Sequence, residues 1–210
     1  AVYIDDVIIY GCNVEEFKET LNLVLQVMQD HQLTCKLQKC SIGVDRVQFL
    51  GHIVDGTKIR MSKSRIQGVT DLQRPTTIPE LRTFLGVCNY FRRFVSNLSI
   101  IIKPLTEQTG KKKLEWSEDL EAAVTRAKQA ISDIPALFHI NYENELIVRT
   151  DASEKGVGGM LLQITSEGDE QPICFMSKSF NETQRKWSTI EQECYGIVHA
   201  ILNTTGQTTC

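Results

Sequence analysis

The sequence predicts an α+β fold, because strand signals and helix signals fall in separate blocks along the chain. β-branched and aromatic residues dominate residues 1–10, and short strand runs bounded by turn residues return at 47–61. Apolar residues at helical spacing then dominate from residue 62 to about residue 134. Further short strand runs follow between residues 145 and 177. A helical middle therefore separates two strand-containing parts.

The first ten residues place two adjacent carboxylates between apolar strand runs. Val, Ile and Tyr favour strands and Asp tolerates turns, so we expect a hairpin with Asp5 and Asp6 at its tip. Neighbouring carboxylates repel each other unless a cation neutralises them, and oxygen ligands of this kind suit Mg²⁺. Metal pairs held in this way commonly catalyse phosphoryl and nucleotidyl transfer. A solvated Asp-Asp turn fits these ten residues equally well.

A helix and a second hairpin are expected next. Asn13 as N-cap and Glu16 three residues later open a helix with its apolar residues on one face. Residues 47–54 are expected to form a strand, Asp55-Gly56 a two-residue turn, and residues 57–61 the returning strand.

Capping signals divide the helical middle. Ser62 begins a short helix that ends at Pro75, and residues 77–80 form a capping box that opens the next helix. Aromatic and basic side chains alternate at residues 89–94, and three lysines follow at 111–113. Arg beside an aromatic ring can stack on bases or neutralise phosphates. The same residues can instead belong to a helix that buries its rings and solvates its arginines.

The net charge of −3 hides a strong internal asymmetry. Residues 1–35 hold one Lys against six acids, and residues 114–210 hold seven basic residues against fifteen acids. Residues 36–113 hold fifteen Lys and Arg against five acids, a net charge of +10. A basic band with interleaved aromatics is expected where a phosphate backbone is bound, although solvated helix faces have the same composition.

The last third predicts three strands and a helix. Residues 145–153, 156–162 and 172–177 have the composition and spacing of an antiparallel meander. A helix is expected from about Ser188, with Glu193 inside it.

The first part of the chain resembles a known family. Tyr-Ile-Asp-Asp at residues 3–6 resembles the Tyr-x-Asp-Asp motif of reverse transcriptases. Residues 39–42 and 49–52 resemble the segment that leads into the primer grip in reverse transcriptases of gypsy-type LTR retrotransposons. Residues 80–86, 89–94 and 103–106 resemble the thumb and connection of the same Pol polyproteins. The resemblance implies the C-terminal part of a polymerase palm followed by a helical thumb.

The last part resembles the RNase H domain of retroelements. Residues 150–153 are similar to its first strand and residues 191–198 to its first helix. The resemblance implies that Asp5 and Asp6 hold the polymerase metals. It further implies that Asp151 and Glu193 hold the nuclease metals, with Glu191 as a competitor for Glu193. The metals expected are Mg²⁺ or Mn²⁺.

The resemblance also implies partners and contact residues. RNA template, DNA primer, RNA-DNA hybrid and dNTP are the expected partners, and no membrane is expected. Arg92 and Arg93 are candidate contacts to a nucleic-acid backbone. The residues expected to support the primer are Phe49, Leu50, Gly51 and His52.

Three domains are expected: a palm part at 1–61, a thumb and connection region at 62–140, and the start of an RNase H-like domain at 141–210. The family pattern has a further palm Asp before the chain and two further acids after it. We therefore expect the domains to be incomplete at both ends and the isolated chain to be inactive. The alternative is a degenerate or domesticated product that only binds nucleic acid or protein.

Cysteine usage and hydropathy bear on location. The seven Cys are odd in number and show no Cys-x-x-Cys spacing, which favours reduced thiols and an intracellular, cytoplasmic or nuclear setting. A metal role for Cys35 and Cys40 is not expected, because no partner pair follows at useful spacing. Neither a long apolar run nor a charged and apolar leader is present, so no membrane span or secretion is expected. Oligomeric state is left open.

Overall fold

A computed structural model describes residues 1–205, and the chain divides into two compact units at residues 1–56 and 57–210. Residues 206–210, the last five of the domain expected at 141–210, lie outside the described residues, and Cys210 is one of them. The mixed helix and sheet content confirms the predicted α+β class.

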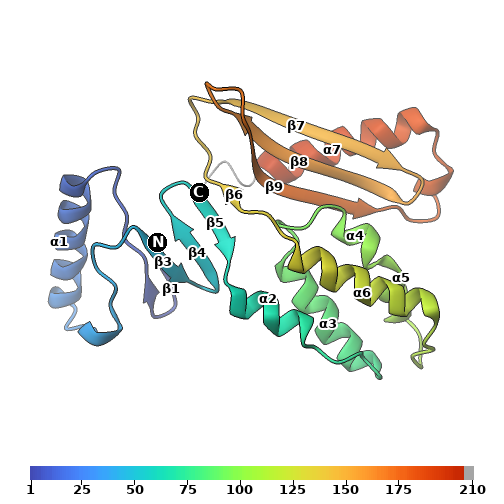
Figure 1. The fold of residues 1–210 in the computed structure, drawn as a ribbon, viewed down its shortest axis with the longest axis horizontal. Coiled ribbons are helices and arrows are strands. Elements are labelled where there is room, and N and C mark those ends of the chain that lie inside the picture. The colour runs from blue at the N-terminus through green and yellow to red at the C-terminus, as the bar shows by residue number, and fades with distance from the viewer. Residues whose placement is uncertain (206–210) are drawn as a thin grey trace. The chain divides into compact units, whose positions relative to one another are not determined.

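The first unit contains two hairpins and one long helix (Figure 1). Its elements are β1 (Val2–Tyr3), β2 (Asp6–Val7), α1 (Val14–Asp30), a 3₁₀ turn (Leu37–Lys39), β3 (Arg46–Phe49) and β4 (His52–Asp55). The capping box predicted at the start of α1 is confirmed. Asn13 Oδ1 accepts a hydrogen bond from Glu16 N at 2.8 Å, and Glu16 Oε2 accepts one from Cys12 N at 2.8 Å. These two bonds satisfy backbone donors that the first turn of a helix leaves free.

The strand expected at residues 47–54 is wrong, because a tight turn interrupts it. Leu50 and Gly51 have φ angles of 50° and 81°, and Phe49 pairs with His52 across the turn. Two consecutive positive φ angles are typical of the two-residue turns that join antiparallel strands, and Gly adopts them without steric cost. A glycine inside a strand pattern was the available signal for this turn.

The second unit carries all the described helices after α1 and a three-stranded sheet (Figure 1). Its first elements are β5 (Lys58–Met61), α2 (Lys63–Thr70), α3 (Ile78–Tyr90), α4 (Leu98–Ile101), α5 (Lys103–Gln108), α6 (Glu118–Ser132) and β6 (Leu137–Phe138). Its last elements are β7 (Glu145–Ser153), β8 (Gly156–Ile164), β9 (Glu170–Ser179), a 3₁₀ turn (Gln184–Lys186) and α7 (Thr189–Thr205).

The helical part of the second unit has its own apolar core. The predicted N-caps are confirmed, since the Ser62 and Thr77 side chains accept hydrogen bonds from Arg65 N and Glu80 N. Buried residues of α3, α5 and α6 form the centre of the core, among them Leu81, Phe84, Leu105, Leu120, Ala127 and Ile131. Burying each large aliphatic or aromatic side chain contributes about 1.5–3 kcal/mol.

Strands β7, β8 and β9 form the predicted antiparallel meander. Successive side chains along β9 point to opposite faces, as expected for a strand. Cys174 and Met176 pack with Ala200 of α7, whereas Phe175 between them packs against the helical core. Helix α7 therefore covers one face of the sheet, and the other face contacts the helical part.

Candidate functional site

The hairpin predicted for the first ten residues is confirmed, with Asp5 in its turn and Asp6 as the first residue of β2. Val2 pairs with Val7 and Tyr3 with Asp6, so that Ile4 and Asp5 form the turn. Backbone hydrogen bonds between Ala1 and Ile8, of 2.9 and 2.7 Å, close the base of the hairpin. Both Asp residues are exposed. Within residues 1–205, neither carboxylate makes an ion pair or a side-chain hydrogen bond, so both remain available to bind a cation.

Ile4 has a conformation that its side chain disfavours. Its φ angle is 54°, in the left-handed region, where a β-branched residue is a clear outlier. The steric cost of this region for a non-glycine residue is about 1–2 kcal/mol. Strained backbone of this kind is concentrated at ligand-binding and catalytic turns.

The four residues expected to support a primer form the β3–β4 hairpin turn. Phe49 ends β3, His52 begins β4, and all four residues from 49 to 52 are half-buried. Phe49 and His52 lie directly opposite each other on the two strands that this tight turn joins.

Arg92 and Arg93 follow the C-terminus of α3, and both are exposed. The Arg92 guanidinium donates a hydrogen bond to Ser99 Oγ at 2.9 Å, and the Arg93 carbonyl accepts one from Phe175 N at 2.9 Å. Ser99 Oγ in turn donates to the carbonyl of Ser177 at 2.9 Å. Arg92 therefore also has a structural role, because its hydrogen bond reaches the contact between the helical part and the sheet.

Asp151 lies on β7, directly opposite Gly158 of β8. The neighbouring Thr150 faces α7, since its Cβ lies 3.8 Å from where a Cβ on Gly196 would be. Alternation along the strand therefore turns the Asp151 side chain to the other face. The Asn97 side chain lies on that face, with its Oδ1 2.0 Å from the ideal Cβ position of Gly158.

Helix α7 carries the other predicted carboxylates, and the two have different roles. Glu191 accepts hydrogen bonds from Ser188 N and Ser188 Oγ, each at 2.8 Å, which lower its pKa and cap the helix. Glu193 is half-buried and makes no such bond within residues 1–205. Glu191 thus serves as a capping residue.

The Asp151 side chain points to the face of the sheet opposite α7, the helix that carries Glu193. Strand β7 is an edge strand in the part of the sheet that is described, so both faces are accessible at that edge. Across residues 1–205, no group of three or more His, Cys, Asp or Glu side chains is arranged to hold a metal.

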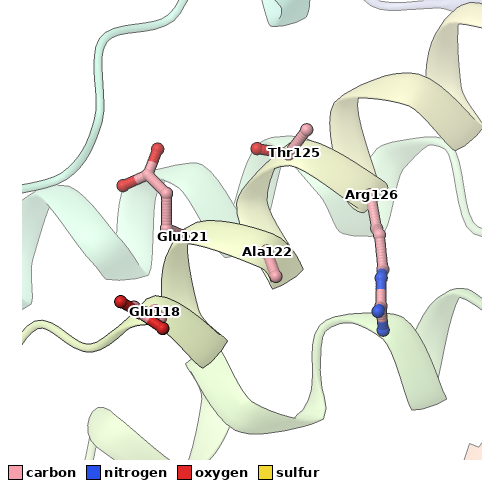
Figure 2. A pocket seen from close by; sticks show the side chains of 5 residues that line it. All are labelled: Glu118, Glu121, Ala122, Thr125 and Arg126. Carbon is pink, nitrogen blue, oxygen red and sulfur yellow. The ribbon is translucent and has the colours of Figure 1, made fainter.

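A surface hollow elsewhere in the second unit contains none of the predicted site residues. It is lined by Glu118, Glu121, Ala122, Thr125 and Arg126, all from α6 (Figure 2). Glu121 accepts a hydrogen bond from Trp116 Nε1 at 2.8 Å and lies 3.6 Å from Arg74. This group is a stretch of exposed helix. Among the described helices, none is both long and apolar enough to span a membrane.

Family models match two segments of the chain. Residues 1–54 match the family described as reverse transcriptase (RNA-dependent DNA polymerase). Residues 116–205 match the RNase H-like domain found in reverse transcriptase. The first match includes Asp5 and Asp6, and the second includes Asp151 and Glu193. Reverse transcriptase and RNase H families generally use divalent metals.

Similar proteins align with nearly the whole chain. The retrovirus-related Pol polyprotein from transposon 297 of Drosophila melanogaster is 32% identical over 205 residues, covering 95% of this chain and 18% of the polyprotein. The corresponding polyprotein from transposon opus of the same organism is 28% identical, covering 96% of this chain and 21% of its own length. The Tf2-3 polyprotein of Schizosaccharomyces pombe is 26% identical, covering 95% of this chain and 15% of its own length. The chain thus spans about a fifth or less of these relatives.

Solved structures of one viral enzyme share the fold. The foamy viral protease-reverse transcriptase in complex with RNA/DNA hybrid has a TM-score of 0.82 at 25% identity, covering 98% of this chain and 28% of that chain. The same enzyme in complex with dsDNA also has a TM-score of 0.82 at 25% identity, covering 99% of this chain and 44% of that chain. With the two family matches and the aligned polyproteins, these likenesses show that the chain belongs to the reverse transcriptase and RNase H-like family of retrovirus-related Pol polyproteins.

Proposed function

We propose that the protein carrying this chain copies RNA into DNA and cuts the RNA strand of the resulting hybrid. The observation that carries the proposal is the strained hairpin that presents Asp5 and Asp6 together within the segment matching the reverse transcriptase family. Carboxylates that make no ion pair in a turn are suitable ligands for a divalent metal, because its charge relieves their mutual repulsion. We infer that the metal is Mg²⁺ or Mn²⁺.

The proposed polymerase step joins a primer to a dNTP. The oxygen of the primer 3′ hydroxyl forms a bond to the α-phosphorus, the bond from that phosphorus to pyrophosphate breaks, and the hydroxyl proton is released. Metal ions bound at the site would activate the hydroxyl and neutralise charge on the phosphates. Asp5 and Asp6 would hold the metal ions, and the closed hairpin fixes both residues in advance of substrate binding.

The primer and the duplex are proposed to contact other parts of the chain. The primer end would be supported by Phe49, Leu50, Gly51 and His52, because they form a tight and half-buried turn. Arg93 would contact the phosphate backbone. Arg92 would do so as well, in addition to making its hydrogen bond to Ser99. RNA template, DNA primer, hybrid and dNTP are the partners that this reaction requires.

The proposed nuclease step is hydrolysis of the RNA strand. Asp151 and Glu193 would hold a divalent metal at the free edge of β7. Side chains from both faces of the sheet can meet at this edge. Glu193 is preferred to Glu191 because the Ser188 hydrogen bonds already engage the Glu191 carboxylate. Water would attack the phosphorus, and the bond to the 3′ oxygen of the preceding nucleotide would break.

The test is RNA-templated primer extension by the full-length protein that carries this chain, with Asp5→Asn and Asp6→Asn variants. Each substitution removes one negative charge and one metal ligand while keeping the size of the side chain. We expect each to lower the extension rate by at least about 10²-fold, as for the loss of other transition-state charge interactions.

Asp30→Asn is the matched control, because Asp30 is another exposed aspartate of the first unit, at the end of α1. Its variant should extend the primer at the wild-type rate. Wild-type extension by the Asp5 and Asp6 variants would exclude the proposed polymerase site. Binding of hybrid with no extension by the wild-type protein would favour a product that only binds nucleic acid.

A further inference from the structure

Two exposed cysteines in the first unit lie beside each other. Cys35 and Cys40 flank the 3₁₀ turn at Leu37–Lys39, between α1 and β3. Two backbone hydrogen bonds hold the turn: Lys39 N donates to Lys36 O at 2.8 Å, and Cys40 N donates to Leu37 O at 3.0 Å. Both thiols are free and exposed. A single turn of backbone thus connects two accessible thiols.

The Cys40 side chain is oriented by its neighbours. Its thiol lies 3.4 Å from the carbonyl of Lys36 and is hydrogen-bonded with the Cys35 side chain. The pKa of Cys40 is raised, first by desolvation and then by Cys35. The Cys40 S–H donates to the Lys36 carbonyl, which leaves the Cys35 sulfur as the one that attacks an oxidant.

We propose that Cys35 and Cys40 form a reversible dithiol–disulfide pair that a hydroperoxide oxidises. The Cys35 sulfur attacks one peroxide oxygen and forms sulfenic acid, and the other oxygen leaves as water. The Cys40 sulfur then bonds to Cys35 and displaces the hydroxyl as a second water molecule. Two thiols and one hydrogen peroxide thus give one disulfide and two water molecules.

The other described cysteines lack this arrangement. Cys88 and Cys174 are buried, and burial raises the pKa of Cys88 to about 12, which opposes thiolate formation. Cys12 and Cys194 are exposed, but neither has a second thiol as a side-chain partner within residues 1–205. The pair is independent of the polymerase proposal, because none of its residues belongs to the hairpins assigned to metal or primer.

Peptide mapping of the 210-residue protein tests the pair directly. Trypsin cuts after Lys36 and Lys39, so a disulfide between Cys35 and Cys40 would join two peptides, residues 19–36 and 40–46. We expect this joined pair after treatment with stoichiometric hydrogen peroxide. Maleimide labelling should be lost at both cysteines and should return after dithiothreitol. Cys12 and Cys194 should keep their labelling under the same conditions.

Serine variants separate pairing from general oxidation. Cys35→Ser should abolish the joined peptides and leave Cys40 labelled, whereas the control Cys12→Ser should leave the joined peptides unchanged. The proposal is overturned if the joined peptides are missing while Cys12 or Cys194 oxidises as fast as Cys35. Loss of Cys40 labelling at an unchanged rate in Cys35→Ser would overturn it as well.

Discussion

At the residue scale, Ile4 connects the sequence of the first hairpin with its proposed function. An Asn or Gly would adopt its φ angle of 54° at much lower cost. The backbone bonds between Ala1 and Ile8 and the pairs beside the turn hold the strained residue in place. The strain sits immediately before Asp5, which supports a functional rather than a purely structural turn.

Glutamates at helix starts show that a carboxylate in a motif is not always a ligand. Glu80 accepts hydrogen bonds from Thr76 N at 2.8 Å and Thr76 Oγ1 at 2.9 Å, and these lower its pKa. Glu191 has the same relation to Ser188. Because a capping role accounts for Glu191, the proposed metal role in α7 falls to Glu193.

The lowered pKa of Glu80 predicts a pH-dependent contribution to stability. A depressed folded pKa stabilises the fold above the unfolded pKa, which is about 4.3, and this stabilisation is lost as pH falls through the folded value. Glu80→Ala should therefore destabilise the protein at pH 7, and the difference from wild type should shrink below about pH 4.3. Urea unfolding at several pH values measures this difference.

Glu118→Ala is the control for that experiment, since Glu118 lies in the first turn of α6 and is exposed. If Glu80→Ala destabilised the protein equally at pH 7 and at pH 3, the charge of the Glu80 carboxylate would make no contribution to the free energy of unfolding.

At the element scale, the sequence predicted most boundaries because local chemistry determines them. Capping boxes gave the starts of α1 and α3, and alternation with turn residues gave the meander of β7, β8 and β9. The turn at Leu50-Gly51 was missed, because Leu carries no turn signal and only Gly51 indicated a break. The hydrogen bonds of Ser99 with Ser177 join residues 78 positions apart, which no local pattern reveals.

Gly156 is required by close approach between strands. A Cβ there would lie 2.4 Å from Lys178 O and 2.8 Å from Ser179 Cα, both backbone atoms that cannot move aside cheaply. Gly156→Ala should therefore destabilise the second unit by about 1–3 kcal/mol. Chemical denaturation followed by circular dichroism measures the change.

Gly68 in α2 provides the opposite control. Nothing lies within 4 Å of its ideal Cβ position, so Gly68→Ala should stabilise the protein by about 0.5–1 kcal/mol through helix propensity. If both variants changed stability by similar amounts and in the same direction, the close packing of β8 on β9 would not be the cause.

At the scale of the whole molecule, charge is distributed by segment. Residues 36–113 have a net charge of +10, and the rest of the chain is acidic. Hydrogen bonds from Ser99 Oγ to Ser177 O and from Phe175 N to Arg93 O also join the helical part to the sheet. The helices of the basic segment that belong to the second unit are therefore packed on the RNase H-like sheet.

The basic segment predicts salt-dependent binding of hybrid or duplex nucleic acid. If three or four of its basic side chains reach phosphates, the slope of log affinity against log salt should be about −3 to −4, with little sequence preference. Arg92→Gln with Arg93→Gln should reduce the slope by up to about two units. Fluorescence anisotropy over a salt series measures it.

Arg185→Gln with Lys186→Gln is the matched control, because this basic pair lies outside residues 36–113. Its slope should equal that of the wild-type chain. A flat salt dependence, or the same loss in both double variants, would reduce Arg92 and Arg93 to structural residues of the α3 terminus.

The central claim is that two separate carboxylate groups serve two reactions. Its most direct test measures primer extension and hybrid cleavage on the same preparations of the full-length protein. Asp5→Asn should abolish extension and preserve cleavage, while Asp151→Asn and Glu193→Gln should abolish cleavage and preserve extension, because each change removes a ligand from one metal site only. Glu191→Gln should preserve both activities. Loss of both activities in every variant, or cleavage that depends on Glu191 and not on Glu193, would contradict the account.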